Sequence, residues 1–384
     1  MPGQHALLSP SAAYRWLHCT AAPRLEATVE DKDSVFAQEG TLAHAHCAYK
    51  LKTFLGLPVD DEIAEMAADD RYHTGEMDEY TDTYKSIVLE KFNAARAWTP
   101  DAQLLVEQRL DFSEYIPDAF GTADAIIIAD GCMEVIDFKY GKGVRVDANR
   151  NPQMMIYALG AFERFSFDYH IDSVRMTIVQ PRIDNLSEYS LIANDLLTWA
   201  DTELTPKAEE AYSDHGKQLP GNWCQFCRVK NGCKALADLC LSTTSIADDP
   251  HYICKKDIEE KVLPRLALIK SWLSGIEDYA LEQALAGVNY AGYKVVEGRS
   301  NRRITDTKAV ESVLTGNGYD ADAILRPQEL RTITDLEKLV GKKQFAALCA
   351  EYIDKPQGKP ALVPDSDKRP AFNAAAEDFK SINI

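Results

Sequence analysis

Two aspartates and a lysine beside a short turn have the spacing of a site that binds a divalent cation and activates water. Asp130-Gly131 is typical of a two-residue β-turn, in which Ala129 faces Cys132 and, further out, Asp124 faces Asp137. Two opposed carboxylates repel each other unless a cation, a proton or a basic side chain lies between them. Lys139 is two residues after Asp137 and shares its face. Carboxylate oxygens there would bind the cation while the ammonium group orients or deprotonates a water.

A different register would remove this site. A shift of one residue moves every side chain to the other face of the hairpin. Lys139 would then be no more than the counter-ion of one aspartate.

Hydrophobic periodicity indicates the elements that must position these residues. Helices are expected at residues 12–19, 41–54, 77–98, 152–165 and 194–212, and strands at 103–112, 122–129, 132–138 and 173–179. Ser9 or Ser11 is the expected N-cap of the first helix, and the acidic stretch 58–70 is expected to be a surface connection. Mixed strands and helices in this order predict an α/β sheet with flanking helices. Residues 1–245 form the predicted first domain, and 246–384, after a linker at 242–250, a mainly helical module with an extended tail.

Composition restricts the classes of protein. The chain has 384 residues, of which 46% are hydrophobic and 27% charged, as in globular proteins. We expect a cytoplasmic protein of a bacterial host cell, because the apolar runs are too short for a membrane span and the start lacks a signal peptide. Residues 1–250 hold 22 Lys and Arg against 40 Asp and Glu, and residues 251–384 hold 20 against 20. This balance argues against loose, charge-driven binding to nucleic acid, but it permits a local basic groove.

Four motifs resemble those of the RecB-like branch of the PD-(D/E)XK nucleases. In that family's order they are Gly40-Thr-Leu-Ala-His44, Gly121-Thr-Ala-Asp124, Val135-Ile-Asp137-Phe-Lys139 and Gln153-Met-Met-Ile-Tyr157. The resemblance implies a restriction-endonuclease-like mixed sheet flanked by helices, and hydrolysis of phosphodiesters with Mg²⁺ or Mn²⁺. It assigns His44, Asp124, Asp137 and the Phe138 carbonyl to the metal, Lys139 to the attacking water, and Gln153 and Tyr157 to the catalytic site near the substrate.

The residues of this set that lie on expected helices could instead have ordinary structural roles. His44 is chosen over His46 by motif spacing, because residues two apart on a helix face nearly opposite directions. His44 is otherwise an ordinary helix histidine. Gln153 and Tyr157 are otherwise a helix polar residue and a half-buried aromatic.

A cysteine pattern resembles the iron–sulfur staple of a subset of the same nuclease branch, which includes AddB and the exonuclease V type. Its members are Cys19, Cys224, Cys227 and Cys233. Four thiolates suit a [4Fe–4S] cluster or a Zn²⁺ ion. The competing arrangement is a local zinc site that uses Cys240 in place of Cys19. A disulfide framework is not expected in a chain without an export signal.

The loop after Lys139 is locally basic and contains glycine. Lys142, Arg145 and Arg150 could contact DNA phosphates there, although a solvated turn would have the same composition. The chain lacks the G-x-x-x-x-G-K-[ST] loop, so binding of a nucleoside triphosphate is not expected.

The expected function is that of an exonuclease acting on DNA ends in phage or bacterial recombination or repair. The sequence also resembles phage-encoded proteins that carry an extra C-terminal region. That region, with the basic run 299–303 and the tail 355–369, could contact DNA or a recombination partner protein. Two other readings remain: a DNA-end-binding or scaffolding protein with little turnover, and a zinc-stabilised interaction module.

Overall fold

A computed structural model describes most of the chain. The described residues are 6–29, 35–69, 71–242, 253–298, 302–326, 329–354, 360–364 and 370–371. They divide into two units, Met1–Trp272 and Leu273–Ile384. The expected domain boundary after residue 245 stays a prediction, and residues 243–250 of the expected linker lie outside the described residues.

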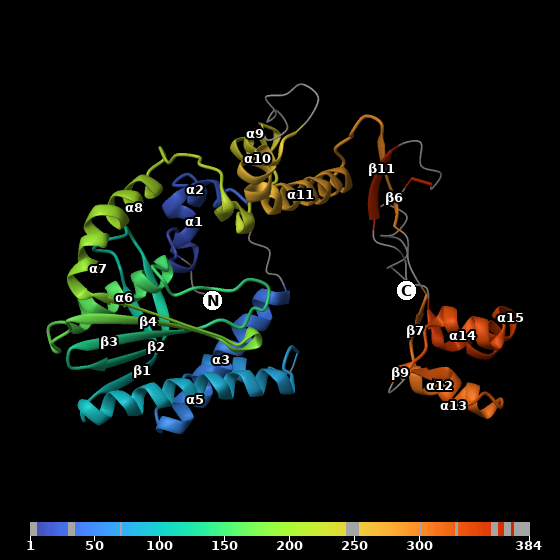
Figure 1. The fold of residues 1–384 in the computed structure, drawn as a ribbon, viewed down its shortest axis with the longest axis horizontal. Coiled ribbons are helices and arrows are strands. Elements are labelled where there is room, and N and C mark those ends of the chain that lie inside the picture. The colour runs from blue at the N-terminus through green and yellow to red at the C-terminus, as the bar shows by residue number, and fades with distance from the viewer. Residues whose placement is uncertain are drawn as a thin grey trace. The chain divides into compact units, whose positions relative to one another are not determined.

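A five-stranded mixed sheet forms the centre of the first unit (Figure 1). Its strands, in spatial order, are β1 (Gln103–Asp111), β2 (Phe120–Ala129), β3 (Cys132–Phe138), β4 (Ser173–Gln180) and β5 (Asn185–Ile192). Strands β3 and β4 are parallel, and the other neighbours are antiparallel. The β2–β3 register, from Ala129↔Cys132 to Ala125↔Ile136, confirms the predicted two-residue turn, and Gly131 has a φ of 79° there.

Helices cover both faces of the sheet, as the alternation of strands and helices predicts (Figure 1). One apolar core includes residues of α1 (Ala13–His18), α6 (Pro152–Phe165), α7 (Ala193–Trp199) and α8 (Thr205–Tyr212). The other includes residues of α3 (Val35–Leu55) and α5 (Gly75–Trp98). A functional residue near a sheet edge can therefore receive partners from either layer.

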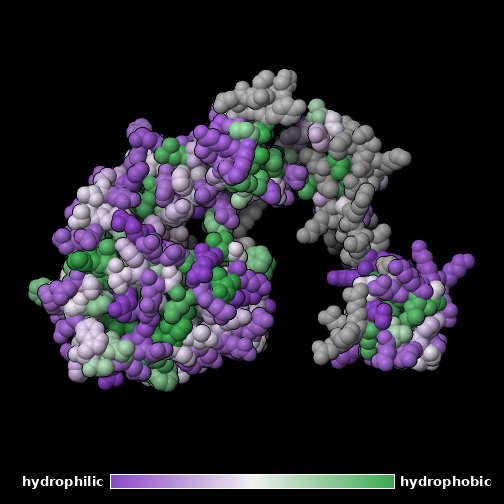
Figure 2. Space-filling model, viewed as in Figure 1, coloured by the Kyte–Doolittle hydropathy of each residue, from purple (hydrophilic) through white to green (hydrophobic). Residues whose placement is uncertain are grey.

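Shorter elements complete the first unit. They are η1 (Pro10–Ala12), α2 (Ala22–Glu26), α4 (Asp61–Ala67), η2 (Pro181–Ile183), η3 (Ala200–Leu204), η4 (Asn222–Phe226), α9 (Lys234–Ser242), α10 (Lys255–Asp257), η5 (Ile258–Val262) and η6 (Leu263–Arg265). The surface of this unit in Figure 2 is mostly hydrophilic, with smaller hydrophobic areas between. Within the described ranges, no helix combines the length and apolar character that a membrane crossing requires.

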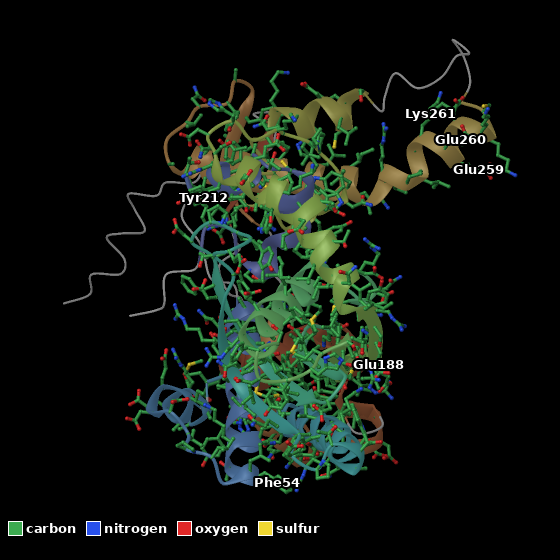
Figure 3. All side chains as sticks on the ribbon, turned by 90° about the vertical axis from the view of Figure 1, so that its left-hand side faces the viewer. Phe54, Glu188, Tyr212, Glu259, Glu260 and Lys261 are labelled. Atoms are coloured by element: carbon green, nitrogen blue, oxygen red, sulfur yellow. The ribbon has the colours of Figure 1, made fainter. Side chains whose placement is uncertain are left out.

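Several local predictions were wrong. The stretch 58–70 contains the helix α4, whose first turn is acidic and so complements the helix dipole. The expected helix 194–212 is confirmed as the continuous run of α7, η3 and α8, although the π-helical turn η3 was not predicted. Strand β5 was not predicted, although its exposed and half-buried residues alternate; Glu188 on it is labelled in Figure 3. Ser9 makes no side-chain cap bond, and its Oγ lies 3.3 Å from Oγ of Ser11 instead.

The second unit contains short strands and a small helical core. Helix α11 (Leu266–Leu285) runs across the division between the units. The other elements are β6 (Tyr293–Glu297), β7 (Arg303–Ile304), α12 (Thr307–Gly316), α13 (Ala321–Ile324), β8 (Leu325–Arg326), β9 (Glu329–Leu330), α14 (Ile333–Val340), α15 (Lys342–Cys349), η7 (Ala350–Tyr352), β10 (Ile353–Asp354) and β11 (Pro360–Pro364). Helices α12 to α15 supply the buried residues of the core. Residues 299–301, 355–359 and 365–369 of the expected basic segments lie outside the described residues.

Candidate functional site

His44 and Asp124 contact each other at the end of the β2–β3 hairpin. Nδ1 of His44, on α3, lies 3.0 Å from Oδ1 of Asp124, and the backbone N–H of Phe138 donates to Oδ2 at 2.7 Å. Burial alone would lower the pKa of His44, but the Asp124 carboxylate outweighs it and raises this pKa to about 9. Burial would raise the pKa of Asp124, yet its charged and hydrogen-bonded partners hold it below its usual value. Asp124 is therefore ionised and paired with a cationic imidazole.

Asp137 has a different set of partners. Nζ of Lys139 lies 3.0 Å from its Oδ2, and Nε2 of Gln153, on α6, donates to its Oδ1 at 3.3 Å. Lys139 also donates to Oε1 of Gln153 at 2.9 Å. Oδ2 of Asp137 is buried and has no well-formed hydrogen bond among the described residues, despite its proximity to Lys139. Burial raises the pKa of Asp137 above its usual value, and the charge of Asp124 adds to that rise although Lys139 opposes it.

Each aspartate is thus compensated by its own cation, in the way that two opposed buried carboxylates require. The regular β2–β3 pairing ends at Ala125↔Ile136, one step before Asp124 and Asp137. Ligand atoms of His44, Asp124 and Asp137 do not form a group in which all lie within 4.8 Å of one another; in the described part of the chain, only His46, His73 and Asp78 do.

Glu107 adds a third carboxylate that the sequence interpretation missed. The pairs Val106↔Ala125 and Gln108↔Ala123 place Glu107 of β1 opposite Asp124. Burial raises the pKa of Glu107 to about 8, with a further contribution from the Asp124 charge. Three acidic positions therefore form one row across β1, β2 and β3, which we call the acid row: Glu107, Asp124 and Asp137. The β1–β2 connection has no short turn signature, so the sequence alone could not fix this register.

Side chains change faces at the acid row. Glu107 has a φ of 53°, which is rare for a residue with a side chain. In a regular strand, residues separated by an even number of positions face the same side of the sheet. Here such residues lie in opposite apolar cores: Val106 and Leu110 on β1, and Ala123 and Ala125 on β2. A local backbone twist therefore directs the acidic side chains at this point, as β-strand irregularities beside functional sites commonly do.

Gln153 and Tyr157 lie on the helix that packs against the sheet, four residues apart on one face as predicted. Asn151 caps this helix by accepting hydrogen bonds from the backbone N–H groups of Gln153 and Met154. Tyr157 is buried, and burial together with the Asp137 charge raises its pKa. Its ring lies 6.0 Å from that of Phe112, centroid to centroid.

A cavity of about 890 Å³ adjoins this site, and Lys139 and Gln153 are among its lining residues. Its other walls combine basic and aromatic side chains: Arg145, Arg150, Lys207, Tyr14, Trp223 and Phe226. Arg145 and Arg150 were expected to contact phosphates, whereas Lys142 is exposed and is not among the lining residues. The aromatic wall was not predicted, because Tyr14 and Trp223 are distant in sequence; their ring centroids lie 6.5 Å apart.

The predicted cysteine cluster is partly assembled. Burial raises the pKa of Cys224, and Cys19, Cys233 and Cys240 all lie close enough to raise it further. Burial also raises the pKa of Cys227, to about 12. All five cysteines are in the described part of the chain, and no three of their sulfur atoms lie within 4.8 Å of one another. Two thiolates on one tetrahedral zinc lie roughly 3.8 Å apart, so the sulfur atoms are more widely spaced than a single zinc requires.

The fold and this site define a class: a mixed α/β protein with buried acids on its central strands and a lysine just after β3, beside a basic and aromatic cavity. The family model described as "Protein of unknown function (DUF2800)" matches residues 5–370, and the chain belongs to that family. Among solved structures, the crystal structure of SSO0001 is similar, with 16% sequence identity over 58% of this chain and 96% of that chain. The TM-score of 0.25 is too low to define a shared fold.

Proposed function

We propose that this protein is a metal-dependent nuclease with a restriction-endonuclease-like core, acting on DNA ends as an exonuclease. One observation carries the proposal: Asp124 and the buried Asp137 lie one step beyond the Ala125↔Ile136 pair, close enough for their charges to interact, with Lys139 3.0 Å from Asp137. Two neighbouring carboxylates of this kind favour a divalent cation, which suits carboxylate oxygens. The four nuclease-like motifs support the same reaction.

The side chains at the acid row fit a hard divalent cation. Asp124, Asp137, His44 after loss of its extra proton and the Phe138 carbonyl would hold Mg²⁺ or Mn²⁺, with Glu107 as a further carboxylate. When bound, the cation supplies charge that polarises a phosphate oxygen and makes a coordinated water more acidic. Burial raises the pKa values of Asp137 and Glu107 and so disfavours their charged forms, which a cation at this position would stabilise.

The remaining side chains position the nucleophile. Lys139 is held by Asp137 and Gln153, so its ammonium group has a fixed direction from which it can orient the attacking water. Gln153 links Lys139 to α6, and Tyr157 stands one helical turn further along the same face. Proton transfer to and from the reacting oxygens by Lys139 is general acid–base catalysis, which depends on this geometry.

The cavity favours a single strand as its occupant. Arginine and lysine side chains can follow the phosphates, while exposed aromatic rings stack on bases without reading their sequence. Arg145, Arg150 and Lys207 provide the charges, and Trp223 and Phe226 provide rings in the same lining set. A strand in this cavity would reach Lys139, which also lines it.

The cysteines would hold a [4Fe–4S] cluster through Cys19, Cys224, Cys227 and Cys233. The wide sulfur spacing favours a cluster over one zinc ion, and the resemblance favours Cys19 over Cys240, which also lies near Cys224. Anaerobic purification followed by iron, sulfide and zinc analysis tests it with Cys19→Ser and Cys240→Ser. Iron and sulfide should be lost with Cys19→Ser and kept with Cys240→Ser. A zinc protein that depends on Cys240 would contradict the cluster.

The nuclease proposal is tested with end-labelled linear DNA, single- and double-stranded, in Mn²⁺ or Mg²⁺. Asp137→Ala should abolish cleavage while the circular dichroism spectrum stays that of the wild type. Asp172→Ala is the matched control, because Asp172 is an exposed aspartate paired with His170 at 3.0 Å. Wild-type cleavage by Asp137→Ala would refute the assignment, and DNA binding without turnover by the wild type would favour an end-binding protein.

A further inference from the structure

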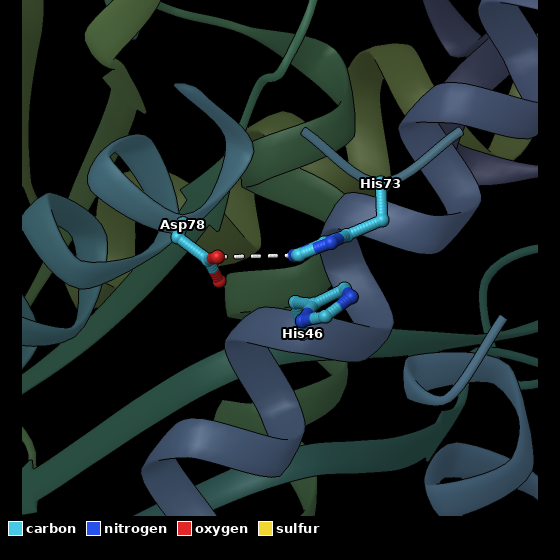
Figure 4. Close-up of side chains that lie close together, drawn as sticks. All are labelled: His46, His73 and Asp78. Carbon is cyan, nitrogen blue, oxygen red and sulfur yellow. Dashed lines mark ion pairs between the residues drawn. The ribbon is translucent and has the colours of Figure 1, made fainter. Parts of the chain in front are cut away.

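Two histidines and an aspartate lie close together beside α3 (Figure 4). His46 lies on α3, His73 precedes α5, and Asp78 is in the first turn of α5. One ligand atom of each lies within 4.8 Å of the others. Nε2 of His73 is 3.1 Å from Oδ2 of Asp78, and the two imidazole rings are stacked with centroids 4.9 Å apart.

His46 is buried without a sufficient partner. Its exposed fraction is 8%, and its Nε2 has no hydrogen-bond partner among the described residues. A buried ring nitrogen that lacks a partner is uncommon in folded proteins and calls for one. The stacked imidazole of His73 offers its face rather than a donor or acceptor.

The carboxylate of Asp78 is shared between Lys50 and His73. Nζ of Lys50 lies 3.2 Å from Oδ1 of Asp78 and 3.2 Å from Oδ2 of Asp82. Nζ of Lys85 also lies 2.9 Å from Oδ1 of Asp82, so the two ammonium groups balance the two carboxylates when both histidines are neutral. Lys50 occupies only one oxygen of Asp78, and the other faces His73.

We propose that His46, His73 and Asp78 form a second metal site, which binds one divalent transition-metal ion of the Zn²⁺ class. Two imidazole nitrogens and one carboxylate oxygen are a ligand set that zinc and similar ions use, with a fourth position left for water. The acid row offers mainly oxygen, which suits Mg²⁺ or Mn²⁺. The two sites therefore differ in the metal that each prefers.

A metal ion at this site would link α3 to the beginning of α5. The ligands come from two helices and the segment that joins them, so one ion would add to the packing and the Lys50 ion pairs that already join α3 to α5. His44 is two residues from His46 on α3 and points to the other side, toward Asp124. A metal at the second site would hold the helix that carries His44 and leave the acid row free.

Metal binding by the full-length chain tests the proposal. Wild type, His73→Gln and Asp78→Asn are dialysed against Zn²⁺ or Co²⁺ with excess Mg²⁺ to occupy hard-oxygen sites, and bound metal is counted. The metal bound by the cysteines and by the acid row is the same in all three proteins, so a difference in bound metal measures binding by His46, His73 and Asp78. We expect each variant to bind one equivalent less than the wild type and to lose the part of the Zn²⁺-dependent rise in Tm that this site provides.

His170→Gln is the matched control. His170 pairs with Asp172 at 3.0 Å, but the described residues offer no second histidine there. This variant should bind as much metal as the wild type. The proposal is overturned if His73→Gln and Asp78→Asn, with unchanged circular dichroism, bind as many equivalents as the wild type and show the same rise in Tm.

Discussion

Gly160 lets α6 approach the sheet closely, and an alanine there should destabilise the first unit. A Cβ atom at this position would lie 2.4 and 2.5 Å from two ring atoms of Phe112, and 3.3 Å from the carbonyl oxygen of Asp111. Phe112 is 1% exposed, so its ring cannot move aside into solvent. Overpacking of this kind costs about 1–3 kcal/mol, and the better helix propensity of alanine returns up to about 1 kcal/mol. We expect a net loss of about 1–2 kcal/mol in the free energy of unfolding.

Gly40→Ala is the matched control, because it makes the same chemical change in another helix. No heavy atom lies within 4 Å of a Cβ built on Gly40 in α3. Without a clash, only the backbone entropy and helix propensity change, which favours alanine by about 0.5–1 kcal/mol. The two substitutions should therefore change stability in opposite directions.

Urea unfolding of the full chain, followed by tryptophan fluorescence, measures both variants at fixed metal concentration. Gly160→Ala should lower the midpoint and Gly40→Ala should raise it, with unchanged slopes. DNA cleavage provides a second readout, because a displaced α6 would carry Gln153 away from Lys139. A Gly160→Ala variant as stable as the wild type would show that the close approach of α6 to β1 is wrong.

Three further predictions follow from buried or capping contacts in the first unit. Thr74→Ala should destabilise by about 1 kcal/mol in thermal unfolding, because the Thr74 side chain caps α5 by accepting a backbone hydrogen bond. Lys91→Met should lower the free energy of unfolding by roughly 1–3 kcal/mol, because Glu134 is 6% exposed and Nζ of Lys91 lies 2.8 Å from its Oε1. Lys85→Met, at an exposed ion pair, should lower it by less than about 0.5 kcal/mol, and equal losses would contradict this prediction. Burial raises the pKa of Glu107 from 4.5 to about 8, so between these pH values the folded state holds a proton that the unfolded state releases. With a chelator present, the free energy of unfolding should therefore fall as pH rises through this interval, and it should fall less steeply in Glu107→Gln.

Local chemistry explains which elements could be predicted from the sequence. Asp130-Gly131 specifies its own turn, since Gly131 adopts a positive φ without steric cost, and the turn then fixes the β2–β3 register. The bounds of α6 match the prediction, because Asn151 caps it and Pro152 suits its first turn. These signals involve neighbours in the chain, and they set the register that runs to Ala125↔Ile136, one step before Asp124 and Asp137.

The parts that were not predicted depend on distant segments. Strand β5 joins the sheet through β4, and its polar residues resemble those of a loop when read alone. The position of Glu107 depends on the β1–β2 register, and the pairing of His46 with His73 depends on how α3 meets the segment before α5. Long-range packing decides all three, and no local pattern encodes it.

The opposite pKa shifts of Asp124 and Asp137 show what the two layers of helices contribute to the candidate site. The hairpin by itself would place two equivalent carboxylates in one row. His44, from the layer of α3, lowers the pKa of Asp124, whereas burial raises that of Asp137 even though Lys139 and Gln153 contact it. A cation at the acid row would share Oδ2 of Asp137 with Lys139, whose Nζ lies 3.0 Å away. Lys139 would keep its 2.9 Å hydrogen bond to Oε1 of Gln153, and both residues line the cavity where an attacking water must be held.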